Sequence, residues 1–125
     1  MKSMLYPLLS HEVLGACFAV HNCLGCGLLE NVYEEALCIE LESRGISLER
    51  QKYFPVYYKG LLAGSYVADM VVSGKIIIEL KSVNSLKAVF ESQLINYLKI
   101  ARVPVGYLVN FKNERVEFKR FVVPV

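Results

Sequence analysis

The chain has 125 residues, a formal net charge of +2 and a hydrophobic content of 54%. This length fits one domain over residues 1–125, with its own core and little room for a separate recognition module. So small a net charge excludes an argument for nucleic-acid binding from the overall field, and attraction to phosphate would have to be local.

Apolar residues at helical spacing predict two helices in the first third of the chain. The first covers residues 8–24, with Ser10 available as its N-terminal cap, and it ends near Gly25. The second covers residues 30–44 and ends before Gly45, which suits a C-terminal cap.

Aromatic and β-branched side chains over residues 47–58 predict a strand, in which Pro55 favours an edge position or a bulge. A hairpin, a helix and two more strands follow, over residues 64–72, 75–83, 85–101, 105–111 and 115–122. The order ααβββαββ predicts an α/β or α+β domain with a central mixed five-stranded sheet flanked by helices.

Three charged residues, Asp69, Glu79 and Lys81, lie on the predicted hairpin. Strand side chains alternate between faces, so Glu79 and Lys81 point the same way. A three-residue loop at 72–74, with Gly74 in the left-handed region, would bring Asp69 to that face as well. The opposite face is apolar and can bury against helices while the charged face opens to a cleft; it carries Ile76, Ile78 and Leu80. This pattern makes a metal site plausible.

The helix at 85–101 has an apolar stripe that one amide interrupts. The stripe consists of Leu86, Phe90, Gln93, Tyr97 and Ile100. Gln93 and Tyr97 can turn their polar ends toward the charged face, or Gln93 can simply hydrogen-bond backbone at the edge of the core. Glu30 has an equally plain alternative, because the helix dipole favours a carboxylate in a first turn.

The four cysteines all lie in the first third of the chain, at Cys17, Cys23, Cys26 and Cys38. No secretory feature accompanies them, so we expect buried, reduced thiols rather than a disulfide framework. His21, Cys23 and Cys26 have spacing that can bind zinc, but a structural zinc site takes four ligands and no second pair follows. A zinc or redox protein is therefore the third-ranked interpretation.

Several short motifs together resemble a known family. The segment from Gly27 to Tyr33, GLLENVY, matches the motif that names the GxxExxY family. Asp69, then Glu79-Leu80-Lys81, then Gln93 to Tyr97 resemble in order the D, ExK and QxxxY elements of RecB-like members of the PD-(D/E)XK nuclease superfamily. The likeness covers nearly the whole chain. It departs from the family pattern at Ala68, where the superfamily's name has proline, at Cys26, where relatives often have proline, and at Phe90, where some have histidine.

The resemblance implies a restriction-endonuclease-like core and a nuclease that depends on Mg²⁺ or Mn²⁺, with DNA as the expected nucleic acid. It implies that Asp69 and Glu79 bind the metal, with the Leu80 carbonyl as a further oxygen and Glu30 reaching the metal directly or through water. Lys81 would orient the attacking water, and Gln93 and Tyr97 would position Lys81 or contact the phosphate backbone. Because all four cysteines are N-terminal, no iron–sulfur cluster is predicted.

A non-catalytic interaction subunit that retains the nuclease fold is the alternative, because the chain is small, weakly basic and rich in apolar residues. The apolar excess also favours a homodimer or another protein partner. Basic residues of the second half either line one cleft or form a solvated rim; they are Lys81, Lys87, Lys99, Arg102, Lys119 and Arg120. No apolar run approaches the roughly 20 residues that span a bilayer, and the N-terminus lacks a signal-peptide layout, so we expect a cytoplasmic protein.

Overall fold

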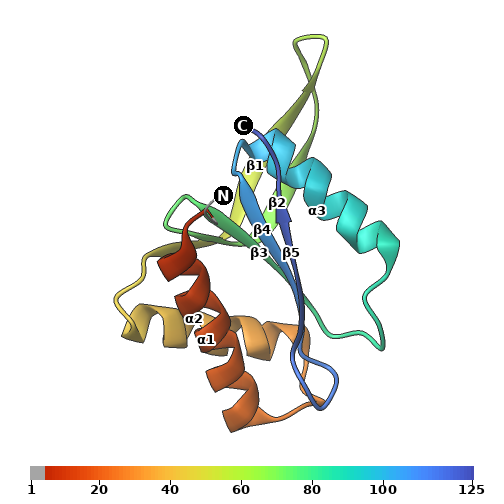
Figure 1. Cartoon of the computed structure of the whole chain (residues 1–125). Helices are drawn as coiled ribbons and strands as arrows, with labels where there is room; N and C mark the ends of the chain where they lie inside the picture. Colours follow the sequence, from red (N-terminus) through yellow and green to blue (C-terminus); the bar gives the residue numbers. More distant parts are fainter. Residues whose placement is uncertain (1–4) are drawn as a thin grey trace, which may run out of the picture.

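A computed structural model describes residues 5–125. In this part of the chain the elements follow the predicted order ααβββαββ (Figure 1). The helices and strands are α1 (Pro7–Leu24), α2 (Glu30–Ser43), β1 (Leu48–Tyr58), β2 (Leu61–Val72), β3 (Ile76–Lys81), α3 (Ala88–Ala101), β4 (Val105–Asn110) and β5 (Glu117–Val122).

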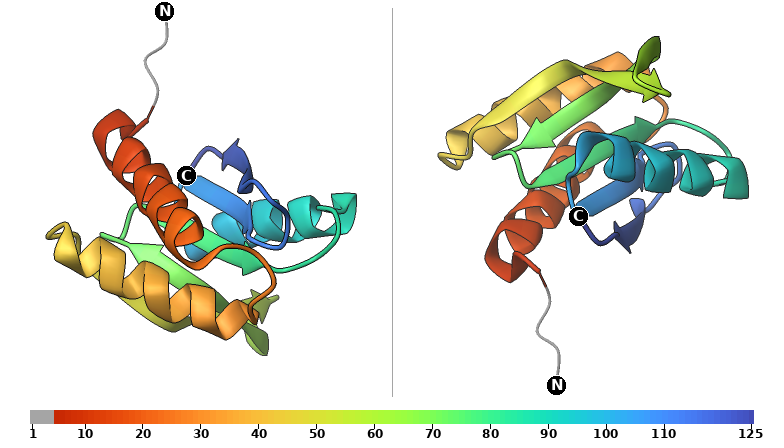
Figure 2. Two further views of the ribbon diagram at one scale, coloured as in Figure 1. Left: turned by 90° about the horizontal axis from the view of Figure 1, so that it is seen from below. Right: turned by 90° about the horizontal axis from the view of Figure 1, so that it is seen from above.

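The five strands form one mixed sheet in the order β1-β2-β3-β4-β5. The β3–β4 pair is parallel and the other three pairs are antiparallel. Helices α1 and α2 cover one face of the sheet and α3 covers the other (Figure 2). The prediction of a central mixed sheet flanked by helices is therefore confirmed.

Both faces of β3 are buried, which corrects the prediction of an open charged face. Ile76 and Ile78 pack into the core beneath α1 and α2, whereas Ile77 packs beneath α3. Glu79 points to the same side as Ile77 and is only 8% exposed. The apolar face was predicted correctly, but α3 also covers part of the face that carries the charges.

The β1–β2 hairpin projects beyond the rest of the sheet (Figure 1). β1 is an edge strand, as Pro55 predicts, and the register shifts between Val56 and Tyr57. β2 begins at Leu61 and not at residue 64, because the strand continues to the tip of this hairpin.

Helix α1 begins earlier than predicted, and Ser10 is not its cap. Pro7 opens the helix, where its fixed φ angle suits the first turn and its missing N–H costs no hydrogen bond. Ser10 therefore lies one turn inside the helix and is buried. At the end of α2, Gly45 has a φ angle of 76° and donates its N–H to the Glu42 carbonyl, so the predicted glycine cap is confirmed.

Helix α3 begins later than predicted, at Ala88, because the preceding loop is held by side-chain amides. Asn110 accepts a hydrogen bond from the Val83 N–H at 3.0 Å and donates one to the Val83 carbonyl at 2.8 Å. Asn113 donates to the Asn84 carbonyl at 3.2 Å. These bonds also end β3 at Lys81 rather than at residue 83.

The prediction of buried cysteines holds for only two of the four. Cys17 and Cys38 are buried, whereas Cys23 and Cys26 are exposed. Cys23 comes after the last buried residues of α1, Val20 and His21, and Cys26 lies beyond the end of that helix. All four thiols are free. Burial raises the pKa of Cys17 to about 12.

No helix within residues 5–125 is both long and apolar enough to cross a membrane. The expectation that the N-terminus lacks a signal-peptide layout rests partly on residues 1–4, which lie outside the described residues.

Candidate active site

The turn between β2 and β3 sets the phase of the two strands. Three residues, Ser73, Gly74 and Lys75, separate the paired Val72 and Ile76. Ser73 and Gly74 have φ angles of 51° and 66°, and the Lys75 N–H bonds to the Val72 carbonyl at 2.9 Å. The predicted three-residue loop is thus confirmed, one position later than expected.

This phase brings Asp69 opposite Glu79. Met70 pairs with Ile78, and these two carboxylates come one position further along their strands from that pair. Asp69 Oδ2 accepts a hydrogen bond from the Leu80 N–H at 2.9 Å, which holds the half-buried Asp69 side chain against β3. Two carboxylates from neighbouring strands therefore meet on the α3 side of the sheet.

Close packing of acidic groups changes their ionisation. Burial, followed by the negative charge of Asp69, raises the pKa of Glu79 from 4.5 to about 8, against the opposing effects of Tyr66 and Lys81. Desolvation and then the Asp69 charge also raise the pKa of Glu30, although this side chain is exposed overall. Since Glu30 and Glu79 both respond to Asp69 and Lys81, these four residues share one electrostatic neighbourhood.

Lys81 lies half-buried at the end of β3. Its Nζ atom is 4.7 Å from the centre of the Phe90 ring, a cation–π contact across to α3. Within residues 5–125, no carboxylate forms a salt bridge with it. Phe90 therefore restrains the ammonium group without neutralising it.

Tyr33 fixes the loop that leads to Glu30. Its hydroxyl donates to the Gly25 carbonyl at 2.6 Å and accepts from the Leu28 N–H at 3.2 Å. Its ring stacks on Phe111 with 4.7 Å between ring centres. Tyr33 thus helps to position Glu30, because its hydroxyl anchors the loop that ends where Glu30 begins α2.

The prediction for Gln93 is wrong in its helical phase. Leu94 and Leu98 form the buried stripe of α3, and Gln93 is exposed. No hydrogen bond within residues 5–125 links its amide to the carboxylates. Tyr97 does reach the site region, because its ring stacks on Tyr66 with 3.5 Å between ring centres and 11° between planes.

Tyr66 is a residue that the sequence reasoning missed. Its hydroxyl donates a hydrogen bond to Glu79 Oε1, and the residue is 7% exposed. No sequence signal marks it, because strict alternation would place Tyr66, three residues before Asp69, on the opposite face. The side chains of β2 change faces between Ala68, which packs beneath α3, and Met70, which packs beneath α1 and α2.

The basic residues do not line one cleft. Lys119 pairs with Glu91 at 2.6 Å, and Arg120 donates to the Tyr107 hydroxyl at 3.0 Å, because both cations lie on the edge strand β5. Lys87 instead borders a hollow of about 350 Å³ at the start of α3, together with Lys112. The residues that line this hollow begin at Ser82, directly after Lys81 in the sequence.

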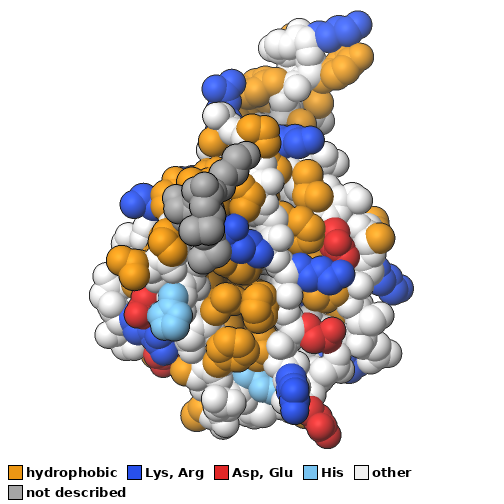
Figure 3. All heavy atoms as spheres, viewed as in Figure 1, with side chains coloured by type: hydrophobic (Ala, Val, Ile, Leu, Met, Phe, Trp, Pro, Cys, Tyr) orange, Lys and Arg blue, Asp and Glu red, His pale blue; other side chains and the backbone are white. Residues whose placement is uncertain are grey.

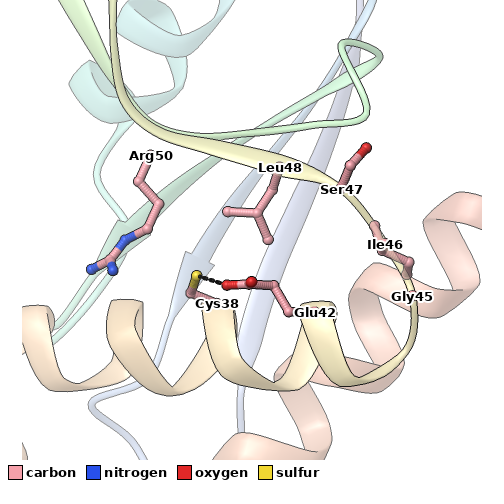
Figure 4. Close-up of a pocket in the computed structure, with 7 residues that line it drawn as sticks. All are labelled: Cys38, Glu42, Gly45, Ile46, Ser47, Leu48 and Arg50. Carbon is pink, nitrogen blue, oxygen red and sulfur yellow. Dashed lines mark hydrogen bonds between the residues drawn. The ribbon is translucent and has the colours of Figure 1, made fainter.

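A wider hollow of about 630 Å³ lies elsewhere, between the end of α2 and the start of β1 (Figure 4). Cys38 in its wall donates to Glu42 at 2.8 Å, and burial with this bond raises the pKa of the thiol to about 11. Arg50 is held by Glu34 and Glu35. With its ionisable groups occupied in this way, the hollow adds nothing to the carboxylate cluster.

A family model described as the PD-(D/E)XK nuclease superfamily matches residues 8–121. The chain belongs to this superfamily. Two solved structures resemble this PD-(D/E)XK protein. The protein designated SSO0001 has a TM-score of 0.58 and 21% sequence identity, over 77% of this chain and 51% of that one. An alkaline exonuclease from Laribacter hongkongensis, LHK-Exo, has a TM-score of 0.55 and 11% identity, over 99% of this chain and 73% of that one.

The PD-(D/E)XK chain thus spans about half the length of SSO0001. No curated protein sequence matches it. The likeness to the two structures, together with the family match, shows that the sheet and helices form the restriction-endonuclease-like fold.

PD-(D/E)XK nucleases typically use divalent metal ions, and the donors around Asp69 suit such an ion. Carboxylate oxygens are the preferred ligands of hard cations, and Mg²⁺ keeps several waters, so it needs few protein ligands. Within residues 5–125, no three His, Cys, Asp or Glu side chains gather into a ready-made cluster. The structure thus brings two carboxylates together, Asp69 and the buried Glu79, and Glu30 lies close enough for its pKa to respond to Asp69.

Proposed function

We propose that the protein is a metal-dependent nuclease of the GxxExxY family, in the RecB-like branch of the superfamily, that hydrolyses phosphodiester bonds of DNA. One observation carries this proposal: Asp69 and Glu79 face each other across β2 and β3, and Lys81 follows on the same side of β3. In this proposal residues 1–125 act as one nuclease domain.

Asp69 and Glu79 would bind the metal, Mg²⁺ or Mn²⁺. Each carboxylate has one oxygen that accepts a hydrogen bond, Oδ2 from the Leu80 N–H and Oε1 from the Tyr66 hydroxyl. Within residues 5–125, no N–H or further hydroxyl donates to Oδ1 or Oε2. The two carboxyl groups also hydrogen-bond to each other when Glu79 is protonated, so a cation between them would take the place of that shared proton. Glu30 would contribute through water, and the Leu80 carbonyl would be a further ligand.

A divalent cation in this place supplies charge neutralisation for the phosphate and a more acidic bound water. It would also relieve the repulsion between Asp69 and Glu79 that helps raise the pKa of Glu79. Lys81 would orient the attacking water and offset the charge on the phosphate, since no carboxylate forms a salt bridge with it within residues 5–125.

The nucleic-acid backbone would lie along the hollow beside α3. Lys87 and Lys112 border this hollow, and phosphate contacts from lysine position a nucleic acid without reading its sequence. Gln93 is exposed on α3, which suits contact with the backbone and does not suit positioning of Lys81.

A cleavage assay tests the proposal. Purified protein is incubated with linear, circular, single-stranded and double-stranded DNA, with Mg²⁺, Mn²⁺ or EDTA. Cleavage is expected only with metal, and Lys81→Ala should lower the rate by at least about 100-fold, as the loss of a group acting on the transition state does. Lys59→Ala at the exposed hairpin tip is the matched control. Cleavage that survives in Lys81→Ala would contradict the proposal.

A second candidate function is an interaction subunit, in a homodimer or with another protein. Hydrophobic side chains gather between α1 and β5 (Figure 3). Phe18 and Phe118 meet edge to face there, 43% and 41% exposed, and Val122 is 49% exposed. A contiguous apolar surface of this kind is typical of protein interfaces.

Light scattering after size exclusion tests the homodimer. A dimer is expected to dissociate in Phe118→Glu, while Tyr53→Glu on the exposed face of β1 should leave the mass unchanged. A monomeric wild-type protein would contradict the homodimer.

A further inference from the structure

Glu79 needs a fixed orientation to act as a metal ligand, and one side chain provides it. The Tyr66 hydroxyl donates to Glu79 Oε1 in a bond buried on the α3 side of the sheet. The two residues lie on different strands, 13 positions apart. Pairing of β2 with β3 extends only from Met70 to Val72 on β2, so backbone pairing does not hold Tyr66 beside Glu79.

The Tyr66 ring is itself clamped between two aromatic side chains. Tyr97 of α3 stacks on it at 3.5 Å between ring centres, and Phe54 of β1 stacks at 6.0 Å. Stacking and burial restrict the ring to one rotamer, and the direction of the hydroxyl is then set. Helix α3 and strand β1 therefore both contribute to the direction of this one hydrogen bond.

We propose that Tyr66, held by the Tyr97 stack, is a positioning residue that fixes Glu79 so that its second oxygen is free for a divalent metal. The inference rests on the proposed metal-dependent function. It also gives Tyr97 a different task from contact with Lys81 or with phosphate, because Tyr97 acts through the Tyr66 ring.

The hydrogen bond from Tyr66 gives Glu79 an arrangement that matches that of Asp69. Asp69 has one oxygen held by the Leu80 N–H, and Glu79 has one held by Tyr66, so the remaining oxygens of the two carboxyl groups are left to face each other, where they share a proton when Glu79 is protonated. Without the Tyr66 hydroxyl, Glu79 is buried with no neutral donor on Oε1 within residues 5–125. Outer partners of this type typically contribute 10- to 100-fold to metal affinity or activity.

Calorimetric titration of the metal-free full chain with Mn²⁺ tests the proposal. Tyr66→Phe keeps the ring and removes only the hydroxyl, and Tyr53→Phe, on an exposed tyrosine of β1, is the matched control. The proposal expects Mn²⁺ affinity to fall by about 10-fold or more in Tyr66→Phe and to stay unchanged in Tyr53→Phe. In the cleavage assay, kcat should fall while KM for DNA stays the same, because Tyr66 is buried away from substrate.

Wild-type Mn²⁺ affinity in a folded Tyr66→Phe protein would overturn the inference and leave the proposed function standing. Should Tyr66→Phe fail to fold, Tyr97→Leu removes the stack and keeps the hydroxyl, and unchanged affinity in that variant would overturn the inference as well. A wild-type protein that binds no Mn²⁺ would instead overturn the proposed function, together with this inference.

Discussion

At the scale of single residues, Glu79 shows how burial and chemistry act on the same group. The side chain is 8% exposed on a strand whose neighbours are aliphatic. Its carboxylate is stabilised by the Tyr66 hydroxyl and by Lys81, yet desolvation and Asp69 outweigh them, and the pKa rises to about 8. In the absence of metal the folded protein therefore holds a proton on Glu79 near neutral pH.

This shift predicts a pH dependence of stability in the metal-free protein. Between pH 4.5 and about 8 the unfolded chain loses the Glu79 proton and the folded chain keeps it. The contribution of Glu79 to stability is therefore fully present below pH 4.5 and is lost as pH rises toward 8, by at most about 1.4 kcal/mol per unit. Urea unfolding in EDTA should show a steeper fall for wild type than for Glu79→Gln. Parallel curves would show that the carboxyl is not coupled to folding.

Tyr33→Phe tests the loop that precedes Glu30. The substitution keeps the stack on Phe111 and removes the bonds to Gly25 and Leu28. The free energy of unfolding should fall by about 1–2 kcal/mol, measured in urea, since two backbone groups lose their partner. The exposed Tyr57→Phe is the control. Equal stability of the two variants would mean that the loop does not depend on this hydroxyl.

Single residues also show what sequence can predict. Asp69, Glu79 and Lys81 were brought together correctly, because strand alternation and an odd loop leave no other face for them. The hydrogen bond from Tyr66 to Glu79 is not predictable from strand pairing, because β2 pairs with β3 only from Met70 to Val72 and Tyr66 lies outside that paired segment. Gln93 lies outside the buried stripe of α3, because Leu94 and Leu98 form the centre of that stripe and Phe90 and Tyr97 lie half-buried at its rim.

At the scale of elements, the turn after β2 determines whether the carboxylates meet. Gly74 has a φ angle of 66°, a region that side chains with a Cβ atom rarely adopt. The sequence therefore predicts Gly74 as the turn residue between β2 and β3. The start of α3 was not, because its loop is held by Asn110 and Asn113 from the distant β4–β5 segment.

Gly74→Ala should destabilise the protein by about 1 kcal/mol, because alanine is strained in the left-handed region. Gly64→Ala, on β2, is the matched control, since an added Cβ there meets nothing within 4 Å and no positive φ angle is involved. Thermal and urea unfolding compare the two variants. Equal stability would contradict the turn geometry.

At the scale of the molecule, helices on both faces of the sheet account for much of the hydrophobic content of 54%. The element order predicted this arrangement, because two helices precede the strands and one lies between β3 and its parallel neighbour β4. What the order did not predict is the surface between α1 and β5, where Phe18 and Phe118 lie on segments far apart in sequence.

The central claim is that Asp69 and Glu79 form one divalent-metal site. Asp69 is the only aspartate in the chain. The substitution Asp69→Asn replaces one of the two carboxylates of the site by a neutral amide of similar shape. Calorimetric titration with Mn²⁺ should show one site in wild type and in the exposed control Glu114→Gln, and no measurable binding in Asp69→Asn. Equal Mn²⁺ affinity in all three proteins, or none in wild type, would contradict the account.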